Sequence, residues 1–214
     1  MHDPATKPQG SGPRKRRGLG CGLFLVGALL VAGGLGYAVW VWITAPKASD
    51  TPLDSSRAAR SACSWPRKYF PSQPAYDGPE PHPVQVMIDK EGSGGYYQKM
   101  LLSSGMTRVP KYLNPSDEST VQLLACLGQP EEGRQVKTCQ FDNPSRDVPM
   151  YEGTYDVTVY EARTGEEIGK ATVPNAADAD CPMLVFYGAD EDPKVYTEPS
   201  VTQLREALAP FTGE

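Results

Sequence analysis

The feature that most constrains this chain is an apolar run near the N-terminus, GLGCGLFLVGALLVAGGLGYAVWVWIT, which carries no charged residue from Gly18 to Thr44. As a helix rising about 1.5 Å per residue, the run is long enough to cross a hydrocarbon core roughly 30 Å thick. Tyrosine and tryptophan gather near its C-terminal end, where such rings favour the headgroup zone. The run therefore predicts a single transmembrane helix over residues 18–44.

Basic residues before the run predict its orientation. Four of them stand directly in front of it: Arg14, Lys15, Arg16 and Arg17. By the positive-inside rule, these topology anchors keep residues 1–17 in the cytoplasm as a short basic tail. Everything after Thr44 then lies on the outer side of the plasma membrane. A cleaved signal peptide fits less well, because Ile43 is a poor −3 residue for a cut after Ala45.

One face of the predicted span carries small residues. Ala28, Ala32 and Gly36 recur at every fourth position, so they share one side of a helix. Small residues let a second helix approach closely, which makes this face a candidate contact for a homodimer or a larger membrane complex. The alternative is an ordinary lipid-facing span, in which small residues are also common.

Charge divides the chain into two unlike parts. Residues 1–44 hold five basic side chains and one acidic, whereas residues 45–214 hold 16 basic and 25 acidic. A negatively charged exported part lacks the basic patches of nucleic-acid-binding proteins, so no nucleic-acid partner is expected. The expected partners are the lipid bilayer and an envelope protein or glycan.

Two irregular stretches follow the span. Residues 45–62, APKASDTPLDSSRAARSA, show no apolar period and predict a flexible linker that holds the domain off the bilayer. Residues 63–83 contain six prolines, which excludes a helix or a central strand. The aromatic residues of this second stretch either form a Pro-rich recognition surface or, as we favour, pack it against the flank of the domain.

From Pro83 onward the pattern becomes that of β-strands, with apolar residues alternating or in short runs. Six segments predict strands: VQVMID, VQLLACL, RQVKTCQF, TYDVTVYEA, the return strand from Ile168 to Val173, and CPMLVFY. Thr164-Gly165 predicts the hairpin turn before the return strand, because glycine takes positive φ readily.

The end of the chain changes to a helical period. PSVTQLREALAPF predicts a short amphipathic helix that ends at Pro210, with Ser200 as N-cap and Gln203 as capping-box partner. Residues 63–214 are therefore predicted to form one mainly β domain, an antiparallel sandwich or open barrel with a short C-terminal α-helix.

Four exported cysteines, Cys63, Cys126, Cys139 and Cys181, predict two disulfides in an oxidising exterior. If Gly133 closes a hairpin, Cys126 and Cys139 face each other, which leaves Cys63 for Cys181. A redox or metal-binding pair is disfavoured, because no Cys-x-x-Cys occurs and His82 is the only exported histidine.

Two acidic clusters are the remaining candidates for binding an ion such as calcium: Asp178 and Asp180, and Asp190 and Asp192. They flank a predicted strand about seven residues long, whose ends would lie roughly 20 Å apart. A solvated acidic rim is the favoured interpretation, so no metal and no other cofactor is expected.

Several blocks of the sequence resemble a known group of proteins. HPVQVMI, VQLLACLG, GTYDVTVYEARTGEEIGKATV, CPMLVF and PKVYTEPSVTQLREAL, within residues 80–211, are similar to uncharacterised membrane-anchored or lipid-anchored envelope proteins of high-GC actinobacteria such as streptomycetes. The resemblance implies a location and a fold. The group has no established activity, so it implies no catalytic residues.

The sequence thus predicts a non-enzymatic single-pass membrane protein that displays a binding module in the bacterial cell envelope. His82 has no Gly-x-Ser-x-Gly elbow to accompany it, and no other catalytic constellation stands out. Two alternatives stay open: an exported hydrolase that uses paired carboxylates, which spacing alone does not reveal, and a structural subunit of a membrane complex.

Overall fold

The computed structural model describes residues 40–89, 97–102, 108–142, 145–176, 179–183, 185 and 192–214. The chain divides into two units, residues 1–45 and 46–214. The predicted cytoplasmic tail, its basic anchors and the small-residue face lie outside the described residues, as does most of the predicted span. Among the residues that are described, no helix is long and apolar enough to cross a membrane.

The described end of the first unit is helical and apolar. Residues 40–44 form the end of a helix, in which the Ala45 amide donates to the Val41 carbonyl at 2.8 Å. Four consecutive side chains here are exposed by between 39% and 72%: Trp40, Val41, Trp42 and Ile43.

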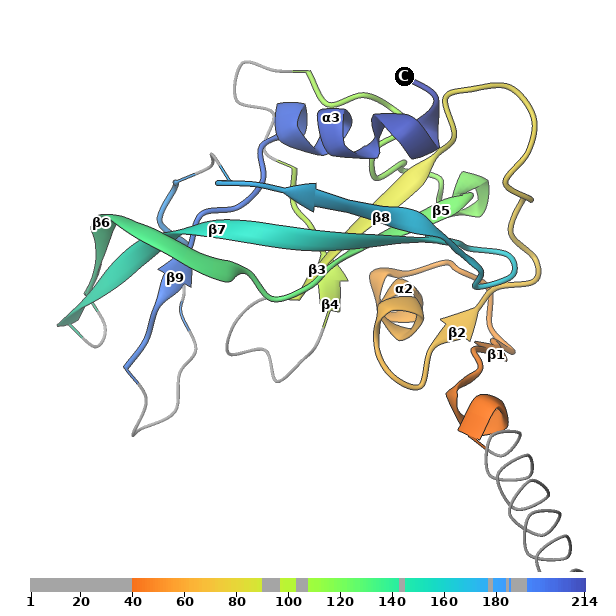
Figure 1. Ribbon diagram of the computed structural model, residues 1–214, viewed down its shortest axis with the longest axis horizontal. Coiled ribbons are helices and arrows are strands. Elements are labelled where there is room, and N and C mark those ends of the chain that lie inside the picture. The colour runs from red at the N-terminus through yellow and green to blue at the C-terminus, as the bar shows by residue number, and fades with distance from the viewer. Residues whose placement is uncertain are drawn as a thin grey trace, which may run out of the picture. The chain divides into compact units, whose positions relative to one another are not determined.

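The second unit is built on one open β-sheet (Figure 1). Five strands form its body, in the order β4 (Tyr97–Lys99), β3 (Val84–Asp89), β5 (Leu123–Leu127), β7 (Ser145–Glu161) and β8 (Glu167–Val173). β3 and β5 are parallel, and the other neighbours are antiparallel. The hairpin between β7 and β8 turns at Gly165, whose φ is +72°, as the sequence predicted.

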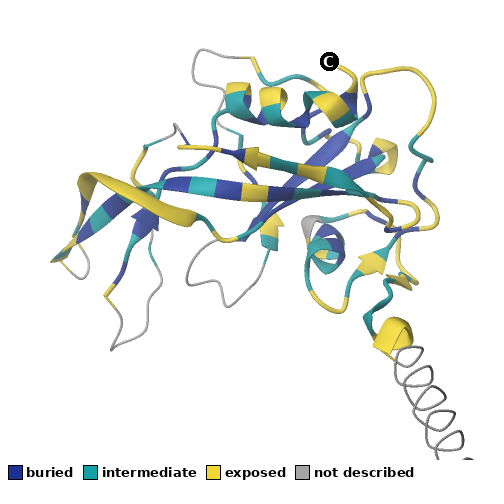
Figure 2. Cartoon of the chain, in the orientation of Figure 1, coloured by how far each residue is buried: buried dark blue, intermediate teal, exposed yellow. Residues whose placement is uncertain are grey.

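A helix covers each face of this sheet. Helix α3 (Val201–Thr212) shares a core with Val84, Val86 and Ile88 of β3, whereas helix α2 (Ser56–Cys63) packs on the face that carries Met87. Every residue of β3 and of β5 is buried, as their dark blue colour in Figure 2 shows. The prediction of a mainly β domain with a C-terminal helix is confirmed.

The finer prediction of a sandwich or open barrel is wrong, because a single open sheet lies between two helices. The physical reason is visible in β3, whose residues are buried on both faces, and above all in LLACL of β5, where five apolar residues follow one another. A strand covered on both faces needs such a continuous apolar run. The expected sandwich would have required polar residues on the outward face.

Residues 45–62 are structured, contrary to the expected linker. β1 (Lys47–Ala48) pairs in parallel with β2 (Lys68–Tyr69), and Leu53 is buried. Helix α2 begins after Ser55, whose hydroxyl accepts from the Ala58 amide at 3.3 Å. The buried residues of α2 are alanines, which explains why this short helix shows no strong apolar period. The folded domain thus begins at Pro46.

The Pro-rich segment packs along the flank of the domain, as we favoured. Phe70 is fully buried, and the Tyr76 hydroxyl donates to the Phe211 carbonyl at 2.8 Å. His82 Nδ1 lies 2.7 Å from Gln122 Oε1, and its backbone amide donates to the Thr212 carbonyl. The buried His82 therefore serves to fix this segment against the sheet.

The N-terminal half of β7 extends beyond the body of the sheet. Here β7 pairs with β6 (Glu131–Asp142) on one edge and with the short β9 (Val195–Tyr196) on the other. We call β6, residues 145–154 of β7 and β9 together the arm. It projects at the left of Figure 1.

The structure corrects the predicted disulfide pairing. All four cysteines are bonded, but the pairs are Cys63–Cys126 and Cys139–Cys181. β5 already has β3 and β7 on its two edges, so no edge is left for a hairpin with β6. Cys126 consequently lies opposite Thr158, with its sulfur toward α2.

The C-terminal helix also extends further than expected. Ser200 and Gln203 form the predicted capping box, but the helix continues through Pro210 to Thr212 and ends at Gly213, whose φ is +79°. A proline in the last turn removes only a single helical hydrogen bond.

A 3-10 turn, η1 (Glu118–Thr120), precedes β5. Cys181, Pro182 and Met183 are not in a strand, and the predicted strand CPMLVFY otherwise falls mostly outside the described residues.

The two disulfides should differ in what their loss disturbs. Replacing both Cys63 and Cys126 by serine should lower the free energy of unfolding by about 2–4 kcal/mol, because the bridge joins α2 to a central strand. Replacing both Cys139 and Cys181 should instead speed amide exchange in the arm. Urea unfolding and hydrogen exchange measure the two effects, and a non-reducing peptide map that linked Cys126 to Cys139 would contradict the pairing.

Gly153 marks a close contact at the root of the arm. A Cβ atom there would lie 3.0 Å from the Thr197 carbonyl oxygen and 2.9 Å from the Tyr155 ring. We expect Gly153→Ala to destabilise the protein by about 1–3 kcal/mol in urea unfolding. One of the two neighbours is the Thr197 backbone, which cannot move aside as easily as a flexible side chain could. Gly128→Ala is the matched control, since its Cβ would meet only the Asp156 carbonyl oxygen at 3.8 Å. Equal effects of the two changes would refute this account.

Candidate functional site

The arm is the most exposed part of the sheet. Every residue of β6 from Glu131 to Thr138 is exposed, which Figure 2 shows as a yellow strand. The pairing of β6 with β7 shifts register between Glu132 and Lys137, and such irregularities discourage another strand from adding to an edge. Because the arm contributes little to the main core, its side chains are available for contacts with other molecules.

The inner face of the arm carries apolar contacts and a covalent link that restrain it. Cys139 lies opposite Val148, and these residues form a small apolar cluster with Met150 and Val195. The disulfide from Cys139 to Cys181 adds a covalent link between β6 and the segment that precedes β9. The apolar cluster and the disulfide, which share Cys139, together restrain the arm.

The opposite face of the arm carries a group that we call the tyrosine cluster, made of Glu132, Tyr151, Lys194 and Tyr196. The rings of Tyr151 and Tyr196 lie side by side on β7 and β9, with their centroids 6.3 Å apart. Lys194 Nζ lies 5.5 Å from the centre of the Tyr151 ring. Strand pairing thus brings two aromatic rings and a cation onto one surface.

Glu132 connects the members of this cluster. Its Oε2 atom accepts from Lys194 Nζ at 2.7 Å and from the Tyr196 hydroxyl at 3.1 Å. The hydrogen bond from Lys194 lowers the pKa of the Glu132 carboxyl below its ordinary value, and the Tyr196 hydroxyl adds to this effect. A carboxylate that is already paired holds the lysine and the tyrosine in place before any partner arrives.

The cluster has the chemistry of a recognition surface. Tyr151 and Tyr196 are both half-buried, so each offers a fixed apolar ring with a polar end. Such rings lose little conformational entropy on binding, and tyrosine is enriched in protein interfaces. The root of the cluster is tied down as well, because the Tyr155 hydroxyl donates to the Thr197 carbonyl at 2.9 Å.

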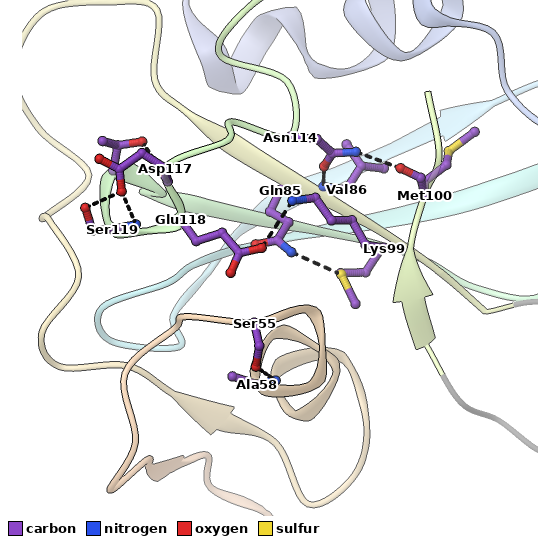
Figure 3. Close-up of polar contacts among 12 residues, drawn as sticks. Ser55, Ala58, Gln85, Val86, Lys99, Met100, Asn114, Asp117, Glu118 and Ser119 are labelled. Atoms are coloured by element: carbon purple, nitrogen blue, oxygen red, sulfur yellow. Dashed lines mark hydrogen bonds and ion pairs between the residues drawn. The ribbon is translucent and has the colours of Figure 1, made fainter. Parts of the chain in front are cut away.

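A second group of polar contacts lies around β3 and β4, and Figure 3 draws it. Lys99 Nζ pairs with Glu118 Oε1 at 3.2 Å. The Asn114 side chain accepts from the Val86 amide at 2.6 Å and donates to the Met100 carbonyl at 2.8 Å. These bonds join the segments at the β4 edge of the sheet, so their role is structural. No residue in the described part of the chain donates a hydrogen bond to the Oε1 atom of the buried Gln85 nearby.

The candidate cation ligands are only partly described. Asp178 and Asp190 lie outside the described residues, while Asp192 is fully exposed and pairs with Arg146 Nη2 at 3.3 Å. Among the residues that are described, no three His, Cys, Asp or Glu side chains come together to hold a metal ion. Calcium binding by this segment stays an untested hypothesis.

No sequence pattern predicted the tyrosine cluster. Its members come from β6, β7 and the segment before α3, and only the pairing of β7 with two other strands brings them together. The sequence places tyrosines in MYEGTY and KVYTEP, but neither motif carries a signal of function on its own.

The pKa of Glu132 tests the geometry of the cluster. Because the folded pKa is lowered, the carboxylate contributes stability above the ordinary glutamate pKa of about 4.3, and this contribution is lost as the pH falls through the folded pKa. Titration of the Glu132 carboxyl carbon by NMR should show the lowered pKa, and Lys194→Gln should raise it toward the ordinary value. An ordinary pKa of Glu132 in the unmodified protein would contradict its contact with Lys194.

Comparisons with protein-family models, with curated proteins and with solved structures found no match to this chain.

Proposed function

We propose that this protein is a single-pass plasma-membrane protein with a cytoplasmic N-terminus. Its extracytoplasmic domain is a non-enzymatic interaction module of the cell envelope, and it binds an envelope protein through the tyrosine cluster. The observation that carries this proposal is the position of the cluster, on an exposed arm that has its own small apolar cluster and a disulfide, apart from the main core.

Three observations support the proposed location. The uncharged run from Gly18 to Thr44 is long enough for a span, and the cluster of basic residues that borders it, Arg14 to Arg17, stands on its N-terminal side. The domain that follows holds two disulfides, which persist in oxidising compartments. The exposed apolar side chains at residues 40–43 suit burial in a lipid environment.

The build of the arm supports binding to a protein. A rigid surface with fixed side chains pays less conformational entropy on association than a mobile loop does. The cluster offers two aromatic rings flanked by one positive and one negative group, a mixture that suits the polar and aromatic surface of another protein. The actinobacterial resemblance agrees with a place in the envelope.

Site-specific photo-crosslinking in the native cell tests the partner. A photoreactive residue at Gln140, an exposed position on β6, should give a discrete adduct with one envelope protein. The same group at Lys170 on β8 is the matched control, and it should give none. Replacing both Tyr151 and Tyr196 by alanine should lower the yield at Gln140 by about tenfold or more, as expected for aromatic interface residues.

Conservative variants separate binding from folding. Replacing both tyrosines by phenylalanine keeps the rings and should keep most of the adduct. A variant that misfolds would lose the adduct and would also expose its disulfides to reduction. An adduct that is absent at Gln140, or one that survives the double alanine variant, would reject the arm as the binding surface. Loss of the protein from membranes after an alkaline carbonate wash would reject the anchored location.

A further inference from the structure

The start of the domain carries an exposed surface that the proposed function does not use. Lys47 and Lys68 are direct partners in the parallel pairing of β1 with β2, so their side chains leave the same side of this small sheet. Both lysines are exposed. Trp65, three residues before Lys68, exposes 71% of its surface. We call these three residues the basal patch.

We propose that the basal patch is a docking surface for the anionic headgroups of the membrane in which the protein is anchored. Trp65 enters the interfacial zone, while Lys47 and Lys68 meet lipid phosphates. The proposal rests on the membrane anchoring proposed above, and it adds a defined orientation of the domain on the bilayer.

The length of the chain keeps the patch close to the bilayer. Only Ala45 and Pro46 separate Thr44, the end of the predicted span, from Lys47, so the three steps cover at most about 11 Å. The expected linker would have allowed the domain to stand far from the lipid. Because residues 47–63 are instead part of the fold, β1 and the neighbouring β2 must lie near the membrane surface.

The distribution of charge favours the same orientation. Residues 46–70 hold five basic and two acidic side chains, whereas residues 71–214 hold 11 basic and 23 acidic. An anionic surface attracts basic segments over a distance set by the salt concentration, and it repels acidic ones. The domain should therefore turn its first residues toward anionic lipid and the remainder away from it.

Exposed tryptophan is the residue type that suits this position. Indole rings prefer the boundary between headgroups and acyl chains, where the apolar ring is buried and the N–H group stays solvated. In the Pro-rich segment, Phe70 is buried and Tyr76 packs against the core, whereas Trp65 remains exposed. Contact with lipid would explain why a large apolar side chain stays at the surface here.

Docking at the basal patch would also place the arm. Arg67, next to Lys68, stacks on the Tyr160 ring near the C-terminal end of β7, at 4.0 Å from the ring centre. Tyr151 lies nine residues earlier on the same strand, which corresponds to about 30 Å of extended chain. Figure 1 shows β1 and β2 at one end of the domain and the arm at the other. A fixed base would hold the tyrosine cluster in a constant direction.

Fluorescence quenching in proteoliposomes tests the proposal with the full chain. The chain has three tryptophans, so Trp40→Phe and Trp42→Phe leave Trp65 as the only one. The vesicles combine phosphatidylcholine with phosphatidylglycerol, and the quencher is a lipid brominated near the top of its acyl chains. We expect blue-shifted Trp65 emission and strong quenching. A distal reporter, Val136→Trp in a chain without the three native tryptophans, should show neither effect.

Charge and salt provide the decisive comparisons. Lys47→Glu combined with Lys68→Glu should abolish the quenching of Trp65, and so should about 1 M salt, at which the Debye length falls to about 3 Å. Vesicles of phosphatidylcholine alone should give weaker quenching than the anionic vesicles.

The outcomes separate this proposal from the one on which it rests. If the protein stays in the vesicles after a carbonate wash but Trp65 is quenched no more than the Val136→Trp reporter, the basal patch does not dock and only this inference fails. Trp65 quenching that is unchanged by both the charge reversal and the high salt would also overturn this inference. If the protein leaves the vesicles in the wash, the anchoring and the docking fail together.

Discussion

The fold depends on one strand that is hydrogen-bonded along both of its edges. The C-terminal half of β7 lies between β5 and β8 in the body of the sheet, and its N-terminal half lies between β6 and β9 in the arm. Backbone pairing along this strand links the two regions, and the Tyr155 hydroxyl, which donates to the Thr197 carbonyl, adds a side-chain contact between them. Val157 and Val159 on this strand face the main core, while Val148 and Met150 on the same strand face the small core of the arm. A single extended segment thus sets the position of the surface that we propose for binding.

The disulfides strengthen the two places where apolar packing is weakest. Helix α2 is short and buries alanines, so its contact with the sheet is small, and the bond from Cys63 to Cys126 ties it to a central strand. The core of the arm contains few side chains, and the bond from Cys139 to Cys181 adds a constraint there. In each case a covalent link replaces buried area that the sequence does not supply.

The two proposed surfaces have different roles in an anchored interaction module. The basal patch, close in sequence to the predicted span, would orient the domain on the bilayer. The tyrosine cluster, about 30 Å along β7, would then meet a partner in a constant direction. A fixed orientation reduces the rotational freedom that association must overcome, which favours binding between two partners held in one membrane.

The sequence by itself determined the elements with strong local signals: VQVMID, LLACL, the turn at Gly165 and the capping box of Ser200 and Gln203. Each depends on neighbours within a few residues, so each is readable locally. Only the tertiary structure decided which strands are adjacent. Strand adjacency set the disulfide pairs and gave one sheet between two helices instead of the expected sandwich. It also brought Glu132, Tyr151 and Tyr196 together. Strand adjacency depends on packing between residues that are distant in sequence, and turn signals such as PEEG do not encode it.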